Sequence, residues 1–253
     1  MAANFDYVFI MQSLNWDFNA KRLERYLTLA WQSGATPVVI LTKADLIVER
    51  AEYLCAAQRI AAGVKVHAIS AQTGEGLEEL AEYVAAGKTV VFLGSSGVGK
   101  SSLVNALAGE EIMAVKEIRE DDSKGRHTTT HRQLIRLQNG AMIIDTPGMR
   151  ELGMWDVSEG LGGAFGDVEQ FLGKCRFSDC KHRTEPGCAV LEAIESGLLP
   201  RERWDSYKKL RSEARYTDNR TAFLLRKQQK NKEIAKYNRA RMKNSFGAID
   251  DKM

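Results

Sequence analysis

A glycine-rich segment, GSSGVGKSS at residues 94–102, constrains this chain more than any other stretch. It matches G-x-x-x-x-G-K-[ST], follows an apolar run and opens a helical pattern, which is the context that the motif requires. In such loops, backbone N–H groups surround a phosphate chain and the lysine reaches the β- and γ-phosphates. The segment therefore predicts a nucleotide site. Its residues are Gly94, Ser95, Ser96, Gly97, Val98, Gly99, Lys100, Ser101 and Ser102.

A second motif, DTPG at residues 145–148, ends another apolar run. An aspartate at that place can hold Mg²⁺ through water, while the Ser101 hydroxyl binds the same ion directly. The backbone N–H of Gly148 can meet a γ-phosphate. Alone, this tetrapeptide could be an ordinary turn, because Pro and Gly are common turn residues. Beside a phosphate loop, we interpret Asp145 and Gly148 as nucleotide-site residues.

The segment TKAD, residues 42–45, also follows an apolar run. The Asp45 carboxylate can accept hydrogen bonds from N1–H and the exocyclic amine of guanine, whereas adenine offers neither donor there. The stem of Lys43 can lie across the base, and Thr42 completes the motif. The pair Ser70-Ala71 ends the next run, where a backbone N–H could meet the guanine O6, but two residues are too short a motif to count alone. On its own, TKAD is equally compatible with a charged turn.

Six apolar or β-branched runs bounded by turn residues are typical of strands, with helical patterns between them. The predicted strands are 6–13, 37–42, 64–70, 89–94, 132–138 and 141–146, and the predicted helices are 19–34, 47–63, 76–87 and 100–109. This alternation predicts an α/β fold with a six-stranded, mostly parallel sheet. The turn at 138–140 predicts an antiparallel hairpin between the last two strands. Cys55 lies in the second helix, where we expect a small buried residue.

The order of the motifs is unusual. Together the motifs resemble the GTPase signature, whose usual order is phosphate loop, switch threonine, DxxG, base motif and SA. Here the base motif and SA come first, which predicts a circularly permuted P-loop GTPase domain. Such a domain should still fold, because packing depends on where elements lie in space more than on where the termini fall.

The pattern changes after residue 158, so we predict a GTPase domain at 1–158 and a mainly helical domain at 159–253. Residues 201–243 hold fifteen Lys/Arg and five Asp/Glu, a net of +10, although the whole chain has only +3. A solvated helix face usually explains such a run, but this excess favours contact with the phosphates of an RNA. Trp204 and Tyr207 are interleaved with these charges.

Three cysteines and a histidine lie close together in the second region, in the order Cys175, Cys180, His182 and Cys188. Three thiolates and an imidazole suit tetrahedral Zn²⁺, and four protein ligands leave no open position for catalysis. We therefore predict one structural zinc ion. The chain shows neither a membrane-spanning apolar run nor a secretory signal, so we expect a soluble, cytoplasmic protein that does not bind membranes.

The polar segment 121–133 is the expected switch. Many GTPases use a glutamine after DxxG to orient the attacking water, but Met149 occupies that position and cannot do so. His127 could orient or deprotonate a water, and a neighbouring threonine could close on Mg²⁺. From chemistry alone, exposed loop histidines at His127 and His131 are the slightly favoured interpretation.

Motif order, the G-R-H-T-T-T segment and the Cys-Cys-His-Cys cluster together resemble the RsgA (YjeQ) family from about residue 4 to residue 245. That resemblance implies a GTP-hydrolysing enzyme that assists late maturation of the small ribosomal subunit and binds its 16S rRNA. We expect the protein to be a monomer. It implies that His127 is the catalytic histidine and Thr129 the catalytic, Mg²⁺-sensing threonine. A hydrophobic residue in place of the glutamine, here Met149, is also a family trait.

Two departures from the family pattern lead to further expectations. The family normally has an N-terminal OB-fold domain, which we expect this chain to lack because it begins directly in the first predicted strand. Thr42 stands where N-K-x-D has asparagine, so guanine affinity could be lower. The alternative to an enzyme is a non-catalytic RNA-binding module that uses GTP as a conformational clamp.

Overall fold

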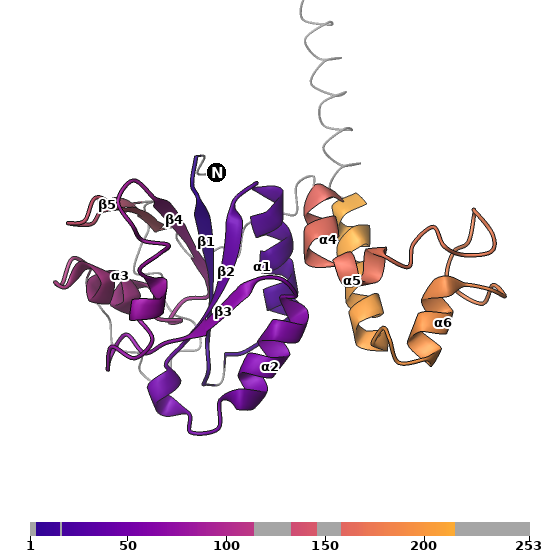
Figure 1. Ribbon diagram of the computed structural model, residues 1–253, viewed down its shortest axis with the longest axis horizontal. Helices are drawn as coiled ribbons and strands as arrows, with labels where there is room; N and C mark the ends of the chain where they lie inside the picture. The colour runs from indigo at the N-terminus through magenta and orange to yellow at the C-terminus, as the bar shows by residue number, and fades with distance from the viewer. Residues whose placement is uncertain (1–3, 16, 114–132, 146–157, 216–253) are drawn as a thin grey trace, which may run out of the picture.

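The computed structural model describes residues 4–15, 17–113, 133–145 and 158–215. Its centre is a six-stranded sheet in the order β3-β2-β1-β4-β6-β5 (Figure 1). Neighbouring strands are parallel except β5 and β6, which pair antiparallel. The strands are β1 Tyr7–Ser13, β2 Thr36–Thr42, β3 Lys65–Ala68, β4 Thr89–Gly94, β5 Gln133–Arg136 and β6 Met142–Asp145. The predicted sheet and its hairpin are confirmed.

The sheet is buried on both faces. Along β1, Val8 and Ile10 join one apolar cluster and Phe9 and Met11 join another, and all four are almost fully buried. Successive side chains of a strand point to opposite faces, so a strand covered on both sides needs a continuous apolar run. The sequence of β1, YVFIMQS, has that pattern.

Helices α1, Ala20–Gln32, and α2, Ala51–Ile60, cover one face, and α3, Lys100–Ala108, lies on the other (Figure 1). The side chain of Asn19 caps α1 by accepting a hydrogen bond from the Arg22 N–H. All three helices were predicted from the sequence. Within the described residues, no helix has the length and apolar character needed to cross a membrane.

Two expectations for this part of the chain are wrong. Residues 76–87 do not form an α-helix; they contain one short 3₁₀ helix, Glu78–Leu80, within a series of turns. The segment packs Leu80, Tyr83 and Val84 onto the sheet, and this packing outweighs its helical propensity. Cys55 is exposed rather than buried, because α2 directs Ala57 and not Cys55 into the core.

The second region is helical and packs directly on α1. It comprises α4, Ser158–Ala164, α5, Gly166–Glu169, α6, Ala189–Glu195, and a helix over 201–215. A Cβ atom added at Gly160 would lie 2.1 Å from the Thr28 carbonyl oxygen, and one at Gly163 would lie 2.7 Å from the Trp31 ring. Glycine at these two positions therefore lets α4 approach α1 closely.

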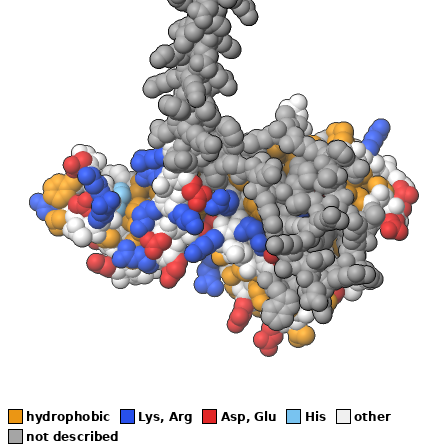
Figure 2. Space-filling model, turned by 180° about the vertical axis from the view of Figure 1, so that it is seen from behind, with side chains coloured by type: hydrophobic (Ala, Val, Ile, Leu, Met, Phe, Trp, Pro, Cys, Tyr) orange, Lys and Arg blue, Asp and Glu red, His pale blue; other side chains and the backbone are white. Residues whose placement is uncertain are grey.

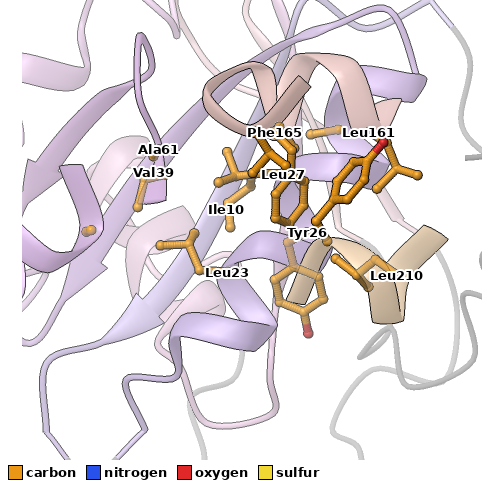
Figure 3. Packing of buried hydrophobic residues seen from close by; sticks show 14 of the residues in the cluster. Ile10, Leu23, Tyr26, Leu27, Val39, Ala61, Leu161, Phe165 and Leu210 are labelled. Atoms are coloured by element: carbon orange, nitrogen blue, oxygen red, sulfur yellow. The ribbon is translucent and has the colours of Figure 1, made fainter. Parts of the chain in front are cut away.

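One apolar cluster contains side chains from both regions. Figure 3 shows Leu27 of α1 packed near Leu161 and Phe165, with Leu210 of the last described helix beside them. Trp204 and Tyr207 also belong to this cluster and are 2% and 3% exposed. They are core residues, although they are interleaved with charged residues in the sequence. This apolar cluster contains residues from both sides of residue 158. The division into two domains at that residue therefore stays a prediction.

Candidate nucleotide site and metal cluster

The predicted nucleotide motifs lie at one edge of the sheet. Strands β1, β2, β4 and β6 are mutually parallel, so their carboxyl ends meet there. Thr42 ends β2, Gly94 ends β4 and Asp145 ends β6. Ser70 lies two residues after the end of β3, at the same edge. Ligands of open α/β sheets bind outside the carboxyl ends of the strands. The chain therefore brings together motifs that are up to 103 positions apart in sequence, from Thr42 to Asp145.

The phosphate loop connects β4 to α3. The Lys100 ammonium donates hydrogen bonds to the carbonyl oxygens of Gly94, at 3.0 Å, and Ser95, at 2.8 Å, so it lies across the loop. Burial lowers the pKa of Lys100, and the charges of Asp145 and Asp17 act in the opposite direction. Gly99, at φ +100°, turns the chain into α3. Ser101 and Ser102 occupy the first turn of that helix.

Thr42 joins the base side of the site to the phosphate side. Its hydroxyl donates a 2.6 Å hydrogen bond to the Val98 carbonyl oxygen inside the phosphate loop, and the side chain is buried. The contact spans 56 residues of sequence. The hydroxyl thus holds the two motifs together, although it has no amide to offer a ligand.

Replacing Thr42 with Val is expected to weaken GDP binding about tenfold, because the isosteric side chain leaves the buried Val98 carbonyl without this donor. Titration of a fluorescent GDP analogue measures the effect. Thr42→Ser keeps the hydroxyl and serves as the matched control, with affinity near that of the wild type. Equal affinities for the Val and Ser variants would contradict the role of this hydrogen bond.

The base-side motifs touch through their backbones. The Ala44 N–H donates to the Ile69 carbonyl oxygen at 3.0 Å, and this contact joins TKAD to the segment that leads into Ser70. Lys43 has a left-handed backbone, with φ 61°, which is uncommon for a residue other than glycine. The Ser70 hydroxyl accepts from the N–H groups of Gln72 and Thr73 and shapes the turn after Ala71.

Asp45 belongs to a short 3₁₀ helix, Ala44–Leu46, and its side chain is exposed at this edge. A ligand can therefore reach the carboxylate. The expected switch residues His127 and Thr129, together with Gly148 and Met149, lie outside the described residues. Their predicted roles stay predictions.

Asp17 belongs to none of the sequence motifs, yet it lies against the phosphate loop. The Ser95 hydroxyl donates a 2.5 Å hydrogen bond to its carboxylate. Asp17 lies in the loop after β1, and β1 pairs with β4, the strand that leads into the phosphate loop. The sequence signal that could have pointed to Asp17 is a polar loop that follows the carboxyl end of a strand next to β4.

The four predicted metal ligands lie together, with their ligand atoms within 4.8 Å of one another. His182 Nδ1 lies 3.4 Å from Cys175 Sγ, 3.6 Å from Cys180 Sγ and 3.4 Å from Cys188 Sγ. Cys175 Sγ and Cys188 Sγ are 3.9 Å apart. Tetrahedral zinc, with bonds of about 2.0–2.3 Å, requires separations of about 3.5–3.8 Å. The cluster therefore fits a zinc ion.

The surroundings of the cluster favour metal binding. Desolvation lowers the pKa of His182 below its usual value, which favours the neutral imidazole that binds metals. Glu185 accepts hydrogen bonds from the N–H groups of Lys181, Arg183 and Thr184, and these bonds lower its pKa to about 2. The Glu185 carboxylate therefore shapes the loop between the second and fourth ligands.

The cluster packs against the apolar core. Cys188 is 1% exposed and lies at the N-terminus of α6, and the His182 ring packs edge-on against Trp204 with 5.6 Å between ring centroids. A metal ion at the cluster would thus connect the loop over 175–188 to the helix over 201–215.

Sheet order, parallel strands and the edge that carries a phosphate loop, TKAD and Asp145 define the class as a circularly permuted P-loop GTPase fold. The family model described as RsgA GTPase matches residues 1–155. The chain belongs to the RsgA GTPase family.

Comparison with individual proteins agrees with this assignment. "Small ribosomal subunit biogenesis GTPase RsgA 2" of Lactiplantibacillus plantarum is 52% identical over 218 residues, 85% of this chain and 61% of that protein. "Small ribosomal subunit biogenesis GTPase RsgA 1" of Listeria innocua is 48% identical over 232 residues, 92% of this chain and 67% of that protein. The chain thus spans about two thirds of these relatives.

Among solved structures, YjeQ from Thermotoga maritima superimposes with a TM-score of 0.61 at 31% identity, covering 82% of this chain and 70% of that one. YloQ, described as a circularly permuted GTPase, gives 0.58 at 30% identity, covering 84% and 69%. The two structures support the permuted fold.

Proposed function

We propose that this chain hydrolyses GTP and acts in the maturation of the small ribosomal subunit. The carrying observation is the single sheet edge that collects the phosphate loop, Asp145, TKAD and Ser70 in a member of the RsgA GTPase family. Relatives at about half identity are named small ribosomal subunit biogenesis GTPases. This combination supports both the proposed nucleotide and the proposed partner.

Each residue of the proposed site has a chemical role. Lys100 and the loop N–H groups stabilise the charge on the β- and γ-phosphates, and Asp45 selects guanine. Ser101 and Asp145 would hold Mg²⁺, which neutralises charge between the phosphates. Thr129 would be a further ligand of that ion, and the backbone N–H of Gly148 would contact the γ-phosphate. Because Met149 cannot orient water, His127 takes that role.

The test is GTP turnover measured with and without purified small subunits, for the full-length protein. We expect turnover to rise with the subunits and His127→Ala to reduce it about 100-fold while GTP binding is retained. His131→Ala, a histidine four residues away, is the matched control. Absence of stimulation would contradict the ribosomal role. Unchanged turnover in His127→Ala would favour a GTP-dependent clamp.

We further propose that the second region binds 16S rRNA. The protein itself is proposed to be monomeric and cytoplasmic. On the helix over 201–215, the exposed basic residues include Arg201, Lys208, Lys209 and Arg215. Figure 2 shows Lys and Arg side chains interspersed with Asp and Glu on the described helical part. The larger share of the basic excess lies in 216–243, outside the described residues. Phosphate contact from that segment would weaken steeply with salt.

We assign the cysteine–histidine cluster to one structural zinc ion. Removing the metal with a chelator is expected to lower the unfolding temperature by about 5 °C or more, because metal binding here contributes to folding. Cys180→Ser should lose the metal, whereas Cys55→Ser, at an exposed cysteine outside the cluster, should keep it. Elemental analysis and thermal melting measure both, and metal-free wild-type protein purified without chelator would refute the assignment.

A further inference from the structure

The loop between β1 and α1 contacts the phosphate loop through Asp17. Asp17 Oδ2 accepts the Ser95 hydroxyl at 2.5 Å, a contact between residues 78 positions apart. Its position follows from the sheet, in which Met11 of β1 lies opposite Gly94 of β4. The chain leaving β1 must therefore pass beside the chain leaving β4.

Asp17 is held in place from its own side of the contact. Arg22 Nη2 pairs with Asp17 Oδ1 at 2.9 Å and also donates to the Asp17 carbonyl oxygen. Gln12, which is fully buried, closes the loop: its side chain accepts from the Asn19 N–H at 2.7 Å and donates to the Asn19 carbonyl oxygen at 3.2 Å. The loop that carries Asp17 is therefore held by hydrogen bonds at both of its ends, and the carboxylate occupies a defined position.

The electrostatics of the loop agree with this geometry. The Lys100 ammonium contacts the Ser95 carbonyl oxygen, so Ser95 is held through its backbone by Lys100 and through its hydroxyl by Asp17. Asp17 is also one of two carboxylates whose charge favours the protonated form of the buried Lys100. The same side chain thus acts on both the shape of the loop and its cation.

We propose that Asp17 is a positioning residue of the nucleotide site: its carboxylate, held by Arg22, fixes Ser95 and with it the first turn of the phosphate loop. The inference rests on the proposed guanine-nucleotide site and adds to it a contribution from the β1–α1 loop. If Asp17 only stabilised the N-terminal end of α1, its contact with Arg22 would be sufficient. The hydrogen bond from Ser95, which lies in the phosphate loop, indicates a role at the nucleotide site.

A double-mutant cycle tests the proposal. GDP affinity is measured by titration for the wild type, Asp17→Ala, Ser95→Ala and the double variant, together with the nucleotide-free unfolding temperature of each. We expect each single variant to bind GDP about three- to tenfold more weakly, because a hydrogen bond to a charged acceptor is lost. The double variant should be within about twofold of the weaker single variant, since both remove one contact.

Asp205→Ala is the matched control, because that aspartate pairs with Lys208 on the surface of the helix over 201–215 and should leave GDP affinity unchanged. If Asp17→Ala does not fold, Asp17→Leu, which has a similar shape and no acceptor oxygen, replaces it in the cycle. Losses that multiply in the double variant, or single variants with wild-type affinity, would overturn the proposal. A wild-type protein that binds no GDP would instead refute the proposed function.

Discussion

Asp45→Asn is expected to bind GTP and GDP about 100-fold or more weakly than the wild type, because two hydrogen bonds to a charged acceptor are lost or reversed. The asparagine amide would place an N–H donor where guanine also presents a donor. Xanthine has a carbonyl oxygen at that position, so the variant should prefer xanthosine nucleotides. Competition of GDP and xanthosine diphosphate against a fluorescent analogue measures the change.

The control for this substitution is Glu49→Gln, which neutralises an exposed carboxylate four residues away and should not alter nucleotide choice. Asp45 is itself exposed, so its replacement should leave the unfolding temperature close to that of the wild type. If Asp45→Asn bound GDP as tightly as the wild type, TKAD would not be the base-recognition motif of this chain.

Arg203→Leu is expected to lower the free energy of unfolding by about 3–5 kcal/mol, because it leaves a buried carboxylate without its cation. Arg203 is 8% exposed and donates to Glu24 of α1 at 3.0 Å and to Asp167 of α5 at 2.9 Å. It also donates to the Ala164 carbonyl oxygen, and its guanidinium lies 4.0 Å from the centre of the Phe165 ring. Urea denaturation measures the loss.

The double variant Glu24→Leu/Arg203→Leu separates the charge effect from packing. It removes both buried charges, so most of the lost stability should return. Lys208→Leu, in the exposed pair with Asp205, should change stability by less than about 1 kcal/mol. An Arg203→Leu protein as stable as the wild type would show that this cluster does not hold the helical region to α1.

These contacts explain why the two regions share one core. Glycine positions in α4 allow close approach to α1, and the Arg203 cluster then joins α1, α5 and the helix over 201–215. The N-terminal end of α1 follows the loop that carries Asp17. One helix thus lies between the phosphate loop and the helical region with its metal cluster.

Local sequence signals were sufficient for the strands, the phosphate loop and the metal cluster. Strands such as β1 must be apolar on both sides when a sheet is covered on both faces, and that requirement is visible in the residues themselves. The phosphate loop and the cluster are each built within fourteen residues, so their spacing carries their geometry. The permuted order of the motifs was also visible in the sequence, because each motif is a short run of neighbouring residues.

Other features depend on residues that are distant in sequence. The segment over 76–87 has a helical pattern, yet packing against the sheet gives it turns. Trp204 and Tyr207 stand among charged residues, yet they face the core, because a helix can be basic on one side and buried on the other.

The sequence by itself therefore determined which motifs this protein has and the type of fold that carries them, because each depends on neighbouring residues. Only the tertiary structure decided how the motifs are held together. The Thr42 hydroxyl meets Val98 and the Asp17 carboxylate meets Ser95 across 56 and 78 residues. Such contacts arise from the order and register of the strands, which bring distant loops to one edge of the sheet.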